Sequence, residues 1–275
     1  MINSIIEMFN YEFMIRAFIV GILLSISSSL IGTSLVLRHN SMIGDGLSHV
    51  GFGTFAVATV LGIPTLKFSI PIVIIISFLI LKVNDNKKIS GDSLIAIIST
   101  ASLAFGTFVI SIKKGINTDI NNYLFGSILS ITKEDVVLSI VIITFVILLF
   151  IFSYNKIFAI TFDEKFAKSI GINTNFYNII FSVLCSIIVV IGMKLIGSLL
   201  ISSLIVFPTI SSKQIFKKYK SVVLSSIIIS VLTFIIGLTF SYYHEIPTGS
   251  TIVIVNVILL LILKIIARFI KKQTT

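Results

Sequence analysis

The sequence predicts an all-α polytopic membrane protein that forms one domain over residues 1–275. Three observations lead to this fold class. The chain is 56% hydrophobic and only 12% charged, its mean hydropathy is +1.13, and its apolar residues gather in runs near the ~20 residues that a helix needs to cross a bilayer. A soluble domain of this size could not shield so much apolar surface from water.

The apolar runs predict nine membrane-spanning helices, separated mostly by short polar turns. The sixth and seventh are divided only by Gly192-Met193-Lys194, so eight spans are an alternative. The predicted spans cover residues 14–37, 41–63, 66–82, 93–112, 135–154, 176–193, 196–212, 221–241 and 249–267. The single cysteine, Cys185, excludes an internal disulfide.

The formal net charge of +10 indicates how the chain is oriented in the membrane. With an external N-terminus, the cytoplasmic segments are 38–40, 82–92, 155–175, 213–220 and the C-terminal tail. These segments and the adjoining helix ends hold 15 of the 21 lysines and arginines, as the positive-inside rule requires. The excess of basic residues therefore indicates the orientation of the chain in the membrane, and we expect no nucleic-acid partner.

Asp45 and His49 stand out in a chain that otherwise keeps charge out of its apolar stretches. A charged side chain at the centre of a membrane helix costs roughly 2.5–3.5 kcal/mol on insertion scales, so such residues are usually functional. Their spacing of four places both side chains on one helical face. A carboxylate beside an imidazole is a ligand set for a divalent transition metal.

Two other interpretations of this pair are open. Asp45 could cap the second helix, and His49 could hydrogen-bond a neighbouring helix. Under the metal interpretation, one protomer supplies too few ligands, but a two-fold dimer supplies four, and its two carboxylates match the charge of a divalent cation. The remaining histidines, His39 and His244, are expected to be solvated, although His244 with Glu245 could help to receive an ion outside the membrane.

The first span carries a stripe of small residues at steps of four, which lets helices approach closely. This stripe either serves ordinary helix packing or borders a narrow substrate path. Its members are Gly21, Ser25, Ser29 and Thr33, with Ser28 and Gly32 alongside.

Residues 161–171 predict a short cytoplasmic helix between two spans. Thr161 and Glu164 match a capping box, and Gly171 is a typical helix stop. Three apolar residues of this segment, Phe162, Phe166 and Ile170, fall on one stripe. The helix either lies on the membrane surface or docks into a partner subunit, and its short length between two spans favours docking.

The sequence contains no GxxxxGK[ST] motif, so the chain cannot bind ATP through a P-loop. Its spans show no series of acidic residues of the kind that proton-coupled carriers use. We therefore expect a transport subunit that is not itself an enzyme, with energy supplied by another subunit. The alternatives are a self-sufficient secondary carrier or channel for divalent cations, and a membrane scaffold.

Five stretches resemble the permease subunits of ABC-type zinc/manganese importers, and they extend over nearly the whole chain. One departure is Gly46 in GDGLSH, where that family usually has Ala or Thr, and we expect it to loosen the helix. The stretches are SLIGTSLVLRHNSMIGDGLSHVGFG, YLFGSILSITKEDV, FDEKFAKSIGI, GSLLISSLIVFPTISS and IPTGSTIVIVN.

The resemblance implies a homodimeric permease of the cell membrane that works with two copies of an ABC ATPase subunit and an extracellular metal-binding lipoprotein. It implies that Asp45 and His49 line the metal path and that residues 161–171 form the coupling helix. The residues expected to couple to the ATPase are Phe162, Asp163, Glu164, Phe166, Ala167, Ile170 and Gly171. No permanently bound cofactor is expected. Zinc, manganese and iron are all compatible as cargo, because imidazole and carboxylate serve all three.

Overall fold

The computed structural model describes residues 8–84, 91–112, 126 and 132–273, and within these ranges its regular structure is all helical. Each of the nine predicted spans corresponds to one long helix, and a short helix, α8, follows the fifth span. Most of the stretch YLFGSILSITKEDV lies outside the described residues. The helices are α2 (Glu12–Leu37), α3 (Met42–Leu61), α4 (Thr65–Asn84), α5 (Gly91–Ile112), α7 (Lys133–Phe162), α8 (Glu164–Ser169), α9 (Thr174–Ile196), α10 (Ser198–Ile215), α11 (Tyr219–His244) and α12 (Thr248–Gln273).

The break between α9 and α10 falls at Gly197 and not at the predicted Gly192-Met193-Lys194. Gly197 has φ 94° and ψ 155°, a conformation that side chains disfavour and that ends α9. Gly192 stays helical, and its missing side chain makes room for Ile201 of α10, whose Cδ1 would lie 2.5 Å from a Cβ there. Both glycines are therefore used, one for packing and one for the break.

Seven of the described helices are long and apolar enough to span a membrane, and α3 is not among them. Its sequence is too polar, because it carries Asp45, His49 and several small residues. The helix is instead enclosed by α4, α5, α9 and α10. A polar helix is tolerated at membrane depth when protein, rather than lipid, surrounds it.

The crossing of α2 and α10 lies at the centre of the bundle and depends on Gly32. A Cβ at Gly32 would lie 2.0 Å from the carbonyl oxygen of Ile205, so only glycine permits this approach. One residue later, the Thr33 hydroxyl lies 3.4 Å from that of Thr209 and 3.1 Å from that of Ser226. At these positions the small-residue stripe of the first span serves close helix packing.

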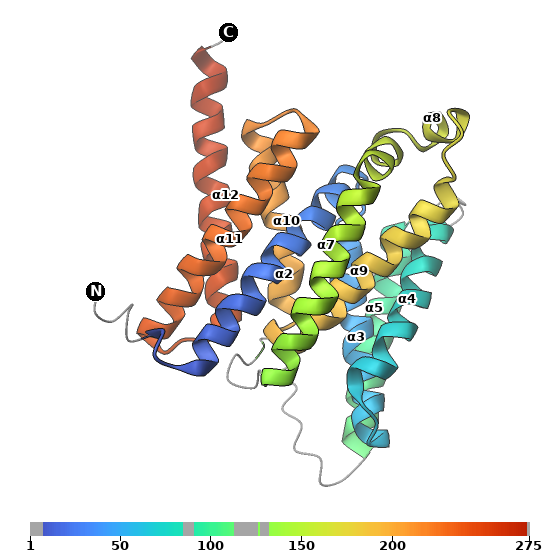
Figure 1. Ribbon diagram of the computed structural model, residues 1–275, viewed down its shortest axis with the longest axis vertical. Helices are drawn as coiled ribbons and strands as arrows, with labels where there is room; N and C mark the ends of the chain where they lie inside the picture. The colour runs from blue at the N-terminus through green and yellow to red at the C-terminus, as the bar shows by residue number, and fades with distance from the viewer. Residues whose placement is uncertain (1–7, 85–90, 113–125, 127–131, 274–275) are drawn as a thin grey trace.

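Figure 1 shows how the ends of the helices are arranged. The helix α8 and the C-terminal end of α12 lie toward the top of the view, whereas α2 and α7 begin at the bottom. The segments predicted to be cytoplasmic, 155–175 and the C-terminal tail, thus extend from the same end of the bundle. This arrangement agrees with the orientation that the lysines and arginines predict.

Candidate functional site

A tight turn between α2 and α3 sets the position of Asp45. The N–H of Arg38 donates to the carbonyl of Ser34 at 3.1 Å, and that of Asn40 donates to the carbonyl of Leu35 at 2.9 Å. His39 between them adopts the left-handed conformation, with φ 59°. The chain therefore reverses within four residues, and Asp45 lies in the first turn of α3.

Asp45 and His49 lie side by side on α3, as their spacing predicts. The Nε2 atom of His49 is 3.7 Å from Oδ2 of Asp45. The carboxylate is 52% exposed and the imidazole 24%, so this pair opens onto the surface of the protomer and is not sealed inside it. A further ligand from outside the protomer can therefore reach both side chains.

The structure supports neither alternative interpretation of the pair. Ser41, and not Asp45, occupies the capping position of α3. The buried Nδ1 atom of His49 has no hydrogen-bond partner among the described residues, so the histidine is not satisfied by a neighbouring helix. The nitrogen that faces the carboxylate is Nε2, so Nε2 is the atom of His49 that could bind an ion together with Asp45.

Asp45 also borders a hollow of about 320 Å³ between α3, α10 and α12. The hydroxyl of Ser202 on α10 donates to Oδ1 of Asp45 at 3.3 Å, and Met42 and Leu199 are among the apolar residues of the hollow. Sequence reasoning missed Ser202. Its only signal was its place in the stretch GSLLISSLIVFPTISS, because a single serine in an apolar helix does not reveal a partner more than 150 residues away.

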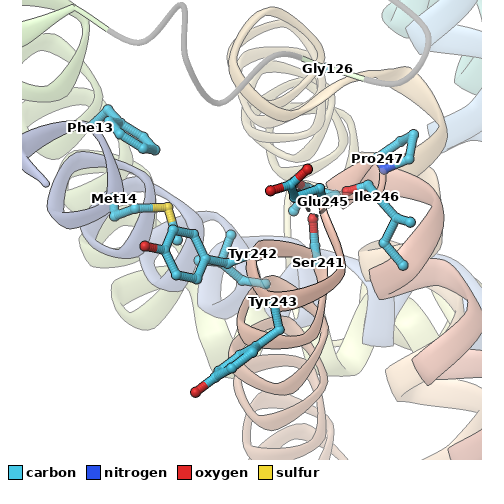
Figure 2. A pocket seen from close by; sticks show the side chains of 11 residues that line it. Phe13, Met14, Gly126, Ser241, Tyr242, Tyr243, Glu245, Ile246 and Pro247 are labelled. Atoms are coloured by element: carbon cyan, nitrogen blue, oxygen red, sulfur yellow. Dashed lines mark hydrogen bonds between the residues drawn. The ribbon is translucent and has the colours of Figure 1, made fainter. Parts of the chain in front are cut away.

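Within the described part of the chain, no group of three or more His, Cys, Asp and Glu side chains could hold a metal ion. His244 and Glu245 therefore do not join Asp45 and His49 in one protomer. They end α11, where the His244 ring packs on Phe240 at 4.3 Å. Glu245, with φ 52°, borders a separate open hollow of about 610 Å³ (Figure 2).

The short helix after α7 begins at a later residue than the sequence predicts. Asp163, and not Thr161, caps α8, because its Oδ1 accepts from the N–H of Phe166 at 2.9 Å. Thr161 belongs to the last turn of α7 and donates to the carbonyl of Ile157. Both residues suit a cap by type, and the continuation of α7 decides between them.

Gly171 ends the short helix as predicted. With φ 84°, it donates to the carbonyl of Lys168 at 3.1 Å, and Ile172 donates to that of Ala167 at 3.0 Å, which together form a Schellman motif. Glu164 pairs with Lys168 at 2.9 Å along the helix.

The apolar residues of this segment point in two directions. Ala167 is buried, and α8 packs against α7 and α9. Phe162, Phe166 and Ile170 are exposed, but they do not form the single helical stripe that the sequence predicts, because Phe162 ends α7 and the extended Asp163 separates it from α8. Phe166 and Ile170 remain open for the membrane surface or for a partner.

Comparison with known proteins places this helical bundle among membrane transporters. The sequence matches the ABC 3 transport family over residues 10–267. The chain belongs to this family.

Two metal-uptake membrane proteins resemble the chain along almost its entire length. It is 27% identical to the manganese import system permease protein ScaB of Streptococcus gordonii, with 99% of each chain covered. It is 28% identical to the high-affinity zinc uptake system membrane protein ZnuB of Buchnera aphidicola, with 94% of this chain and 99% of the relative covered.

A solved structure is similar as well. PsaBC from Streptococcus pneumoniae in complex with Fab superposes with a TM-score of 0.87 and 26% identity, over 99% of this chain and 100% of that chain. As a member of the ABC 3 transport family, the chain is a multi-pass membrane permease subunit and not the subunit that hydrolyses ATP.

Proposed function

We propose that this permease moves a divalent transition metal ion into the cytoplasm, as a homodimer, with energy from ATP hydrolysis on two copies of a partner ATPase. An external metal-binding lipoprotein delivers the ion. The single observation that carries the proposal is the Asp45–His49 pair, in which Oδ2 of the carboxylate and Nε2 of the imidazole lie 3.7 Å apart on a partly exposed face of α3.

The geometry of the pair fits a shared metal ion. Two ligand atoms that bind one ion at about 2.1 Å in a tetrahedral arrangement lie about 3.4 Å apart. The separation of Nε2 and Oδ2 is 3.7 Å, so a small side-chain adjustment brings both onto one ion. Such an ion is cargo, and its ligands must release it within each transport cycle.

The count of ligands supports a dimer. The described residues of one protomer supply only two ligands at this place, whereas a stable site for zinc or manganese takes four or more. A two-fold axis beside the exposed face of the pair brings two carboxylates and two imidazoles together. Their two negative charges balance a divalent cation without an uncompensated charge at membrane depth.

The same ligands indicate the class of the metal ion but do not distinguish one metal within that class. Relatives that are named for manganese and for zinc are about equally similar to this chain. Imidazole and carboxylate also bind ferrous iron. We therefore propose a first-row divalent metal, of which manganese and zinc are the first to test.

The proposal is tested by metal uptake into proteoliposomes that contain the permease with its ATPase and binding protein. We expect Asp45→Asn and His49→Gln each to abolish ATP-dependent uptake of manganese or zinc while the complex still assembles, because each change removes two of the four ligands. His244→Ala is the matched control, and we expect it to retain uptake. Normal uptake by both site variants would refute the site, and uptake by the permease alone would support a self-sufficient carrier instead.

A further inference from the structure

Arg38 lies where the turn before the Asp45–His49 pair meets the two helices that flank α8. It is the residue directly after α2. Its Nη1 donates to Oδ1 of Asn178 on α9 at 3.0 Å, and its Nε donates to Oγ1 of Thr161 on α7 at 3.4 Å. The guanidinium also stacks over the Phe181 ring, 5.0 Å from its centroid.

The hydrogen-bond partners of Arg38 lie on the two helices that precede and follow α8 in the chain. Thr161 comes two residues before Asp163, the cap of α8, and Asn178 lies in the second turn of α9, just after the turn at Gly171. Thr161 is itself fixed, because it is buried and its hydroxyl donates to the carbonyl of Ile157 at 2.7 Å. A displacement of α8 that carries the adjoining ends of α7 and α9 with it therefore moves both groups that hold the guanidinium.

The segment that joins Arg38 to Asp45 is rigid. The backbone of Arg38 is hydrogen-bonded into the last turn of α2, and the N–H of Ile43 donates to the carbonyl of Asn40 at 3.1 Å. The left-handed conformation of His39 leaves little freedom between them. Asp45 follows within the first turn of α3, so the turn transmits a shift of Arg38 to the carboxylate.

We infer that Arg38 is a positioning residue that transmits movement of α8 to the Asp45–His49 pair and so couples the partner ATPase to release of the ion. This inference rests on the proposed function. The chemistry favours arginine specifically, because a planar guanidinium can donate to two helices and stack on an aromatic ring together, whereas a lysine ammonium is a point charge.

The experiment measures ATP hydrolysis and metal uptake in the same proteoliposomes, with the full complex of permease, ATPase and binding protein. The variants are Arg38→Ala and Arg38→Lys, and Arg268→Ala in α12 is the control, an exposed arginine, whereas Arg38 is partly buried. We expect Arg38→Ala to raise the ATP consumed per ion by about 2- to 30-fold, the range for a residue that carries coupling between sites. The ATP consumed per ion by Arg38→Lys should lie between the values for the unmodified protein and Arg38→Ala. Arg268→Ala should have the same value as the unmodified protein.

The ratio separates coupling from a purely structural role, because a destabilised complex loses hydrolysis and uptake together and keeps the same ratio. Unchanged ratios in both Arg38 variants would overturn the inference, and if Arg38→Ala does not assemble, Arg38→Lys decides alone. Asp45→Asn distinguishes the two proposals. If it transports normally, the proposed function fails, and if it is inactive while Arg38→Ala keeps the normal ratio, only the role of Arg38 fails.

Discussion

Replacing Gly32 with alanine tests the central crossing of α2 and α10. The added Cβ would lie 2.0 Å from the Ile205 carbonyl oxygen and 2.8 Å from its carbonyl carbon. Because these are backbone atoms, no rotamer change relieves the contact, and the two helices must separate by roughly 1.5 Å to reach ordinary van der Waals distance. Overpacking of this kind costs typically 1–3 kcal/mol, with about 1 kcal/mol regained from the better helix propensity of alanine.

A contact this short with backbone atoms places the cost in the upper part of that range, at about 2–3 kcal/mol. We therefore expect Gly32→Ala to lower the free energy of unfolding by about 1–2 kcal/mol, which corresponds to a fall in Tm of roughly 2–8 °C for a chain of this size. The assay is thermal unfolding of the purified permease in detergent with a thiol-reactive fluorophore. Cys185 is the single cysteine and is buried, so it reacts only when α9 comes apart from its neighbours.

Gly51→Ala on α3 is the matched control. A Cβ there would meet only the Cε and Sδ atoms of Met193, both at 3.2 Å, and a flexible methionine end can move aside. We expect the Tm of Gly51→Ala to equal or exceed that of the unmodified protein. A Tm for Gly32→Ala as high as that of Gly51→Ala would refute the backbone contact between α2 and α10.

Two further predictions concern local contacts. Removing the α8 cap with Asp163→Ala should raise amide hydrogen exchange at Phe166 about 5-fold, which is the equivalent of a typical cap of ~1 kcal/mol. Thr161→Val should leave that exchange unchanged. The reverse pattern would show that Thr161, and not Asp163, caps α8. The ion pair of Asp135 with Lys194, 2.6 Å apart, joins the start of α7 to the end of α9, so Asp135→Asn and Lys194→Met should each cost roughly 1–3 kcal/mol. The double variant should cost less than the two together, and strict additivity of the Tm shifts would contradict the pair.

Gly46 shows that a departure from a family pattern can have a role that the sequence does not reveal. From the sequence, its flexibility predicts a looser helix around Asp45, and this stays a prediction. In the structure Gly46 faces α5, where a Cβ would lie 2.5 Å from Cγ2 of Ile95. The glycine therefore allows α3 and α5 to pack closely, and this role depends on a neighbour that lies about fifty residues away in the sequence.

Helix ends were less predictable than helices for a related reason. Apolar runs located each of the nine long helices of the described residues, because such a run is a local property of the chain, although α3 is too polar to qualify as a span by hydropathy. Hydropathy could not decide between Gly192 and Gly197 as the break, since both are glycines in apolar surroundings and only the packing of Ile201 against Gly192 separates them. The cap of α8 was misplaced because α7 continues through Thr161, whose side chain is held by Arg38.

Composition and periodicity were enough to predict a membrane protein, the nine long helices of its described residues, and a helix that presents an acid and an imidazole on a single face. These properties follow from composition and from the 3.6-residue helical repeat, which act over a few turns. Only the tertiary structure decided that the polar helix α3 is enclosed by its neighbours, that Ser202 contacts Asp45, and that Arg38 joins the α2–α3 turn to the helices flanking α8. Each of these depends on side chains far apart in the chain, which come together only when the helices pack.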